Sequence, residues 1–146
     1  MADPITVAGE LVVGPPEAPS LVAGRCDSCR EFHFPPQPNC PLCGALRINP
    51  TPLSRRGTLW TWTIQTFPPP APPFRGNVEN FAPFGVGYVE FPEGVRVEGR
   101  LTIADERALR IGMPVEVAIA SYGSDGTGRE LRGFAFAPVA PGTEQS

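Results

Sequence analysis

Four cysteines constrain the fold of this chain more than any other feature. Cys26, Cys29, Cys40 and Cys43 are its only cysteines, and they read C-x2-C-x10-C-x2-C. Each C-x-x-C turn directs two thiolates toward one point, and the stretch between them is long enough for a hairpin that brings the two pairs together. This spacing is typical of a tetrahedral zinc site with four thiolate ligands.

Three alternatives to zinc differ in what they require. Two disulfides need an oxidising compartment, and residues 1–10 show neither the basic start nor the apolar run of a secretory signal. A rubredoxin-like iron site uses similar spacing, so iron could load into this one under some conditions. A redox centre would need only one of the two pairs. The sequence therefore favours zinc, with iron as the alternative metal.

The predicted metal site has no open coordination position for a substrate or water. Four protein thiolates complete a tetrahedron, so we expect a structural metal rather than a catalytic one. His33, the only histidine, lies between the two cysteine pairs. It would be a fifth ligand, so it is predicted to be a packed or surface residue. Since the cysteines are committed to metal, no Cys–His or Ser–His set can be assembled, and no catalytic residue is predicted.

Composition bounds the rest of the chain. Its 146 residues suffice for one ordinary domain or two small ones, and a ribbon of about 30 residues needs metal or a neighbouring domain to hold its shape. No apolar run approaches the ~18 residues of a membrane span, so a soluble, cytoplasmic protein is expected. Twenty prolines and sixteen glycines favour short strands and loops over helix bundles.

The charge balance argues against a nucleic-acid partner. The net charge is −3, the pI is about 5.2, and every cationic side chain is an arginine. A nucleic-acid module usually carries a basic footprint. Arg25, Arg30 and Arg47 lie close to the cysteines in the sequence. They are expected to offset the negative charge of a zinc–thiolate centre rather than to bind phosphates.

The chain is predicted to have four parts. They are an N-terminal arm (1–20), a zinc ribbon (21–50), an OB-fold (51–138) and a C-terminal tail (139–146). Prolines prevent a long helix in the arm, which is either a loosely ordered terminus or a segment that orders on a partner. In the ribbon, Gly44 directly follows a cysteine, where a tight turn often requires positive φ.

Alternation of apolar and polar residues predicts an all-β domain after the ribbon. The expected strands are residues 58–66, 85–91, 95–103, 115–119 and 131–137, with one short helix at 104–110. Five strands with a helix between the third and fourth is the element order of an OB-fold barrel. The predicted fold is therefore a rubredoxin-like zinc ribbon followed by a five-stranded OB-fold barrel.

Two aromatic-rich segments are open to two interpretations each. Trp60, Trp62 and Ile64 alternate with polar residues, which favours a place in the barrel core over a stacking platform for single-stranded nucleic acid. Residues 67–83 combine six prolines with three phenylalanines and are long for a hairpin loop. Such a loop is predicted to contact a partner, with capping of the barrel as the alternative.

The order of these parts resembles a known family. A ribbon that reads GRCDSCREFHFPPQPNCPLCG precedes the segments GTLWTWTI, GVGYVEFPEGVRVEGRLT and LRIGMPVEV. Together they are similar to the zinc-ribbon OB-fold acyl-CoA-associated family, domain of unknown function thirty-five, over residues 22–137. LRIGMPVEV is the most specific of these segments, because unrelated zinc ribbons lack it.

The resemblance implies an accessory role. Family members are typically non-catalytic subunits that bind thiolase-fold enzymes, including thiolases, acyltransferases and aldolases of steroid degradation. Some bind hotdog-fold enoyl-CoA hydratases instead. The implied assembly is a hetero-oligomer that supports carbon–carbon bond formation or cleavage in CoA thioesters, and in archaeal relatives the OB-fold helps to form a shared CoA site. Only the four cysteines carry over as residues, in the role of zinc ligands.

Two departures from the family leave the partner open. The proline-rich start replaces a helix that members often have, and the first barrel loop is longer than usual. Arg55, Arg56 and Arg75 lie near the expected barrel entry and are weak candidates for contacts with CoA phosphates. A single-stranded nucleic-acid-binding OB-fold protein is the alternative from another functional class, and the acidic pI argues against it.

Overall fold

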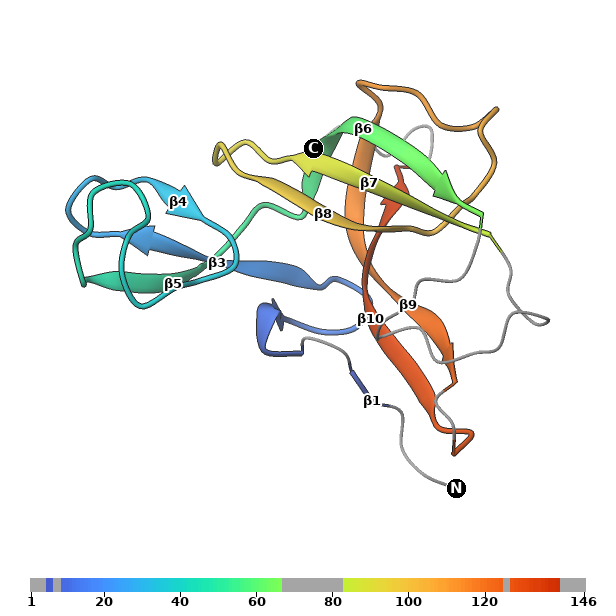
Figure 1. Ribbon diagram of the computed structural model, residues 1–146, viewed down its shortest axis with the longest axis horizontal. Coiled ribbons are helices and arrows are strands. Elements are labelled where there is room, and N and C mark those ends of the chain that lie inside the picture. The colour runs from blue at the N-terminus through green and yellow to red at the C-terminus, as the bar shows by residue number, and fades with distance from the viewer. Residues whose placement is uncertain (1–4, 7–8, 67–82, 125–126, 140–146) are drawn as a thin grey trace.

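Figure 1 shows the two parts of the molecule in the computed structural model, a small ribbon beside a larger barrel. The structure describes residues 5–6, 9–66, 83–124 and 127–139. The proline-rich loop, Arg75 and most of the C-terminal tail lie outside the described residues, and the predictions made for them stay predictions.

The barrel contains the five strands that the alternation predicted. They are β6 (Arg56–Gln65), β7 (Phe84–Glu90), β8 (Arg96–Leu101), β9 (Pro114–Ser124) and β10 (Glu130–Pro138). Their order is β10-β8-β7-β6-β9, and β9 also pairs with β10, which closes the sheet on itself. Closure satisfies strand edges that would otherwise be exposed. The all-β class and the five-stranded barrel are therefore confirmed.

Inward-facing apolar side chains fill the barrel. Val97 and Val117 are buried, and Phe136 is completely buried. The rings of Phe134 and Phe136 pack with centroids 5.8 Å apart. A glycine makes room for them, because a Cβ atom at Gly99 would lie 2.8 Å from atoms of both rings. The core thus depends on one missing side chain as well as on those present.

The short helix predicted at 104–110 is not formed, and the segment makes turns instead. The Asp105 carbonyl accepts a hydrogen bond from the Ala108 N–H, and the Asp105 side chain accepts one from the Arg107 N–H. A side chain that bonds the local backbone in this way competes with helix propagation. Beyond the turn, the Gly112 N–H donates to the Leu59 carbonyl and the Leu59 N–H donates to the Met113 carbonyl. The segment between the turn and these bonds is too short for a stable helix.

The ribbon is organised around one central strand. β3 (Ser20–Cys26) pairs with β2 (Val12–Val13), β4 (Phe32–His33) and β5 (Ile48–Pro52). A 3-10 turn, η1 (Gly9–Leu11), precedes β2, and β1 (Ile5–Thr6) runs parallel to β10. Described residues of the N-terminal segment therefore pair with both parts of the molecule.

Ribbon and barrel share one hydrophobic core. Leu21 and Ala23 on β3 are completely buried and belong to the same cluster as the barrel residues. Leu53, in the connection between β5 and β6, is 3% exposed and joins them. Phe34 of the ribbon packs edge-to-face on Phe134 of β10, with ring centroids 6.4 Å apart. Burial of apolar surface shared by the two parts stabilises the contact between ribbon and barrel.

Candidate metal centre

Two turns of the ribbon bring the four cysteine thiols together. The Sγ atoms of Cys26, Cys29, Cys40 and Cys43 all lie within 4.8 Å of one another. The Cys26–Cys43 pair is 3.6 Å apart and the Cys29–Cys40 pair 3.7 Å apart. All four are free thiols, so the two-disulfide alternative is not formed. Sulfurs about 3.8 Å apart are what a tetrahedron with ~2.3 Å zinc–sulfur bonds requires.

The two cysteine turns repeat the same backbone pattern. In the first, the Arg30 N–H donates to the Cys26 carbonyl and the Cys26 N–H donates to the Glu31 carbonyl. In the second, Gly44 and Ala45 occupy the equivalent places around Cys40. The turn ends at positive φ in both, 66° at Arg30 and 80° at Gly44. The expectation of positive φ at Gly44 is therefore confirmed, whereas the first turn holds an arginine in a conformation that favours glycine.

Backbone N–H groups prepare two of the thiols to ionise. Hydrogen bonds from the Cys43 and Leu42 N–H groups lower the pKa of Cys40 to about 7, against an opposing effect of burial. The N–H of Cys29 likewise lowers the pKa of Cys26. A hydrogen bond from Glu31 favours the Cys29 thiolate, but burial and the neighbouring thiols raise the pKa of Cys29 to about 12. Several adjacent thiolates therefore need a bound cation to coexist.

His33 is a packed residue, as expected. Its side chain is 8% exposed, and its Nε2 accepts a hydrogen bond from the Gln37 N–H at 3.1 Å. A Cβ atom at Gly24 would lie 2.5 Å from the same nitrogen, so the ring fills the space above β3. Among the described residues, the four cysteines form the only His, Cys, Asp or Glu group able to hold a metal ion.

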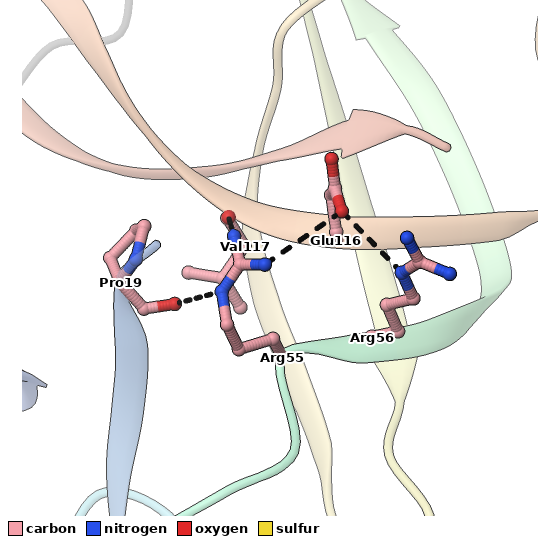
Figure 2. Close-up of polar contacts among 5 residues, drawn as sticks. All are labelled: Pro19, Arg55, Arg56, Glu116 and Val117. Carbon is pink, nitrogen blue, oxygen red and sulfur yellow. Dashed lines mark hydrogen bonds and ion pairs between the residues drawn. The ribbon is translucent and has the colours of Figure 1, made fainter. Parts of the chain in front are cut away.

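A single arginine ties the ribbon to the barrel (Figure 2). Arg55 donates from Nε to the Pro19 carbonyl, which precedes β3, and from an Nη atom to the Val117 carbonyl on β9, both at 3.0 Å. The Val117 N–H in turn donates to the Arg55 carbonyl. Glu116 accepts ion pairs from Arg55 at 3.9 Å and from Arg56 at 3.5 Å. The guanidinium of Arg55 is thus part of the junction.

The residues just before Arg55 also make hydrogen bonds across the junction. The Leu53 N–H donates to the Leu21 carbonyl. The Ser54 N–H and hydroxyl both donate to Glu93 Oε2, at 3.0 and 2.8 Å. The segment that connects β5 to β6 is thereby bonded to the turn between β7 and β8, next to the contacts of Arg55. The CoA role considered for Arg55 and Arg56 stays a prediction, with Arg55 already engaged on two carbonyls.

Trp60 corrects the sequence interpretation of the first barrel strand. The pairing of β6 with β7 shifts register between Leu59 and Thr61, so Trp60 is an extra residue in a β-bulge. Leu59 fills the core, and the Trp60 side chain is 45% exposed instead of lying in the core. Trp62 and Ile64 do pack against the core, as predicted.

Two further exposed residues join Trp60, and sequence reasoning missed both. Tyr88 on β7 is 40% exposed and meets the indole edge-to-face, with ring centroids 6.2 Å apart. The Arg96 guanidinium on β8 lies over the indole at 4.0 Å from its centroid. Outward alternation on β7 and β8 could have marked Tyr88 and Arg96, but only the bulge places Trp60 beside them. These three residues are called the aromatic platform below.

An open groove of about 480 Å³ adjoins the aromatic platform. It lies between the start of β6 and the β7–β8 turn. Its walls are formed by Arg56, Gly57, Thr58, Glu90, Phe91, Pro92 and Gly94. Glu90 connects the groove to the platform, because its carboxylate pairs with Arg96 at 3.4 Å. No helix in the described part of the chain has the length and apolar character needed to cross a bilayer.

Two family models match the two parts of the chain. The model described as "ChsH2, rubredoxin-like zinc ribbon domain" matches residues 15–48. The model described as "ChsH2, C-terminal OB-fold domain" matches residues 50–120.

Individual proteins are similar along most of the chain. A DUF35 domain-containing scaffold protein of Pyrococcus furiosus is 31% identical over 122 residues, 82% of this chain and 83% of that protein. The benzoylsuccinyl-CoA thiolase subunit BbsA of Thauera aromatica is 28% identical over 122 residues, 84% of this chain and 78% of that subunit. A solved structure called Ltp2-ChsH2(DUF35) aldolase is 28% identical with a TM-score of 0.59, covering 83% of this chain and 86% of that one.

Proposed function

Because this chain belongs to the DUF35 family, with its ChsH2-type zinc ribbon and OB-fold domain, we propose that it is a non-catalytic accessory subunit. In this proposal it binds a thiolase-superfamily enzyme and supports formation or cleavage of carbon–carbon bonds in CoA thioesters. The observation that carries the proposal is that its relatives are named as scaffold proteins, as a thiolase subunit and as part of an aldolase.

In the same proposal the four cysteines bind one structural zinc ion. The rubredoxin-like ribbon match and the clustering of all four Sγ atoms within 4.8 Å support it. With four protein ligands the metal would have no open position for a substrate, so it would hold the two turns in place and supply positive charge to the thiolates. This assigns the chemistry of the complex to the partner.

The junction between ribbon and barrel suits a scaffold. A subunit that positions another protein must keep its own contact surfaces in a constant arrangement, because disorder at an interface costs binding free energy. The shared core and the bonds of Arg55 to both parts supply that rigidity.

Co-expression tests the proposal. The tagged chain is produced with each thiolase-superfamily enzyme of its native host, and the molar mass of purified material is measured by light scattering. We expect a stable hetero-oligomer, no turnover of a β-ketoacyl-CoA by the isolated chain, and turnover by the complex. An isolated chain that cleaves the thioester, or one that binds a hotdog-fold hydratase and no thiolase-superfamily enzyme, would contradict the proposal.

Contact with CoA is a separable part of the proposal. Titration of an acyl-CoA into the isolated chain, the isolated enzyme and the complex compares the three dissociation constants. Tighter binding by the complex than by either component would support a shared CoA site. Equal binding by the enzyme and the complex would limit this chain to scaffolding.

A further inference from the structure

The β-bulge at Trp60 exposes a side chain that strand alternation alone would bury. Bulges add one residue to a strand and redirect the side chains around it. Here the extra residue sends a large aromatic ring to the outside while Leu59 completes the core. At 45% exposure Trp60 keeps part of its apolar surface in water, and covering that surface would add free energy of burial. The bulge thus leaves apolar area on the outer face that a partner can cover.

The exposed residues around Trp60 are already ordered for binding. Tyr88 holds the edge of the indole, and Arg96 covers its face at 4.0 Å. Arg96 is itself held by Glu90 at 3.4 Å. Tryptophan, tyrosine and arginine are the residues most enriched among binding hot spots, and a platform ordered beforehand loses little side-chain entropy on binding.

Charge pairing identifies the kind of partner. Arg96 is paired with Glu90, and Arg56 at the far wall of the groove is paired with Glu116. Glu98 lies outward on β8 beside Arg96 and adds negative charge. A polyanion such as nucleic acid needs unpaired cations along its path. The surface therefore fits a protein of low local charge, with apolar side chains for the platform and the groove.

We infer that the aromatic platform and the adjoining groove form the surface on which the thiolase-superfamily subunit docks. This inference rests on the proposed function and adds the location and the chemistry of the contact. The partner contributes an apolar side chain to the groove at Pro92, which is exposed, and an uncharged surface that covers the exposed part of the Trp60 indole. Strands β6 to β8, which cross the upper part of the barrel in Figure 1, thereby carry the docking face on the side that bears Trp60, Tyr88 and Arg96.

The test compares matched exposed residues in the full chain. Trp60→Ala and Tyr88→Ala remove the platform, and Val13→Ala removes a side chain of similar exposure, 42% against 45%, on strand β2 of the ribbon sheet. Binding to the thiolase-superfamily enzyme recovered by co-expression is measured by calorimetry. Circular dichroism and zinc content check that each variant is folded. Trp60→Ala should weaken binding at least about 30-fold, the effect of a hot spot of about 2 kcal/mol, and Val13→Ala less than about 3-fold.

A second measurement leaves the aromatic platform intact. The chain has two tryptophans, so Trp62→Phe leaves Trp60 as its only indole, and incorporation of 7-azatryptophan into this chain alone separates its emission from that of the partner's tryptophans. Complex formation should shift its emission to shorter wavelength and reduce quenching by acrylamide, because the partner covers the ring.

Each outcome bears on one of the two proposals. If the wild-type chain binds the enzyme and Trp60→Ala binds equally well, or acrylamide quenching is unchanged, the docking surface is wrong and the proposed function stands. If the wild-type chain binds no thiolase-superfamily enzyme, the proposed function fails and the inference fails with it. Oligonucleotide binding at low salt that Trp60→Ala abolishes would overturn the inference in favour of nucleic acid.

Discussion

Replacing Arg55 by methionine should loosen the junction between ribbon and barrel. The side chain donates two hydrogen bonds at 3.0 Å to carbonyl oxygens, one from the approach to β3 and one on β9. These carbonyls belong to Pro19 and Val117, and both residues are buried. Methionine keeps much of the length and apolar contact of the arginine stem but leaves both carbonyls without this donor.

The magnitude follows from the bonds lost. A hydrogen bond to a charged group contributes about 1.5–3 kcal/mol, and the lower end applies because the Arg55 side chain is 35% exposed. Two such bonds give about 3 kcal/mol. The ion pair with Glu116 at 3.9 Å adds only about 0–1 kcal/mol at this exposure. For a chain of this size the loss corresponds to a decrease in Tm of roughly 6–12 °C.

Urea unfolding of the zinc-loaded protein, followed by tryptophan fluorescence, measures the change in free energy of unfolding. Arg56→Met is the matched control, because it removes an equally exposed arginine. The ion pair of Arg56 with Glu116 lies within the barrel and does not connect it to the ribbon. The control should cost about 0–1 kcal/mol. If Arg55→Met and Arg56→Met lower the free energy of unfolding equally, the assignment of Arg55 to the junction is refuted.

Three further predictions concern the metal centre, the core and one partly buried tyrosine. Cys40→Ser should reduce bound zinc below one ion per chain and lower the Tm, measured by metal analysis and calorimetry; full zinc content in the variant would contradict a four-thiolate site. Gly99→Ala should lower the free energy of unfolding by about 1–3 kcal/mol in urea, because its methyl group meets the core rings at 2.8 Å, and an unchanged value would show that the barrel relaxes freely. Burial raises the pKa of Tyr122, with Arg100 opposing the shift. Its contribution to stability is therefore complete below about pH 10, the unfolded value, and is lost as pH rises through the higher folded value. In a Tyr88→Phe variant Tyr122 is the only tyrosine, so its absorbance at alkaline pH should rise later in folded than in urea-unfolded protein, and coincident curves would exclude the shift.

Features that depend on short-range pattern were predictable. The cysteine spacing led to the thiol cluster because each C-x-x-C turn directs its own pair, and a hairpin of ten residues has few ways to join two such turns. Alternation along 95–103 placed Val97 and Leu101 correctly in the core, because strand side chains change face at every residue. These features needed no knowledge of distant neighbours.

Features that depend on residues distant in sequence could not be predicted from the local pattern. The bulge at Trp60 follows from how β6 pairs with β7, and the one extra residue places Leu59 in the core and the Trp60 ring outside it. Residues 104–110 do not form the predicted helix. Backbone hydrogen bonds between Leu59, which is distant in sequence, and Gly112 and Met113 hold the chain just beyond this segment. Local propensity predicted the wrong element where long-range hydrogen bonds were available.

Residue spacing along the chain was enough to indicate a four-cysteine ribbon and a five-stranded barrel. How these parts act together emerged from the folded arrangement. It joined ribbon and barrel through Arg55 and a common core, and it placed Trp60, Tyr88 and Arg96 on one outer face. The reason is physical, since spacing along a chain sets local geometry, whereas strand register and packing set which distant side chains meet.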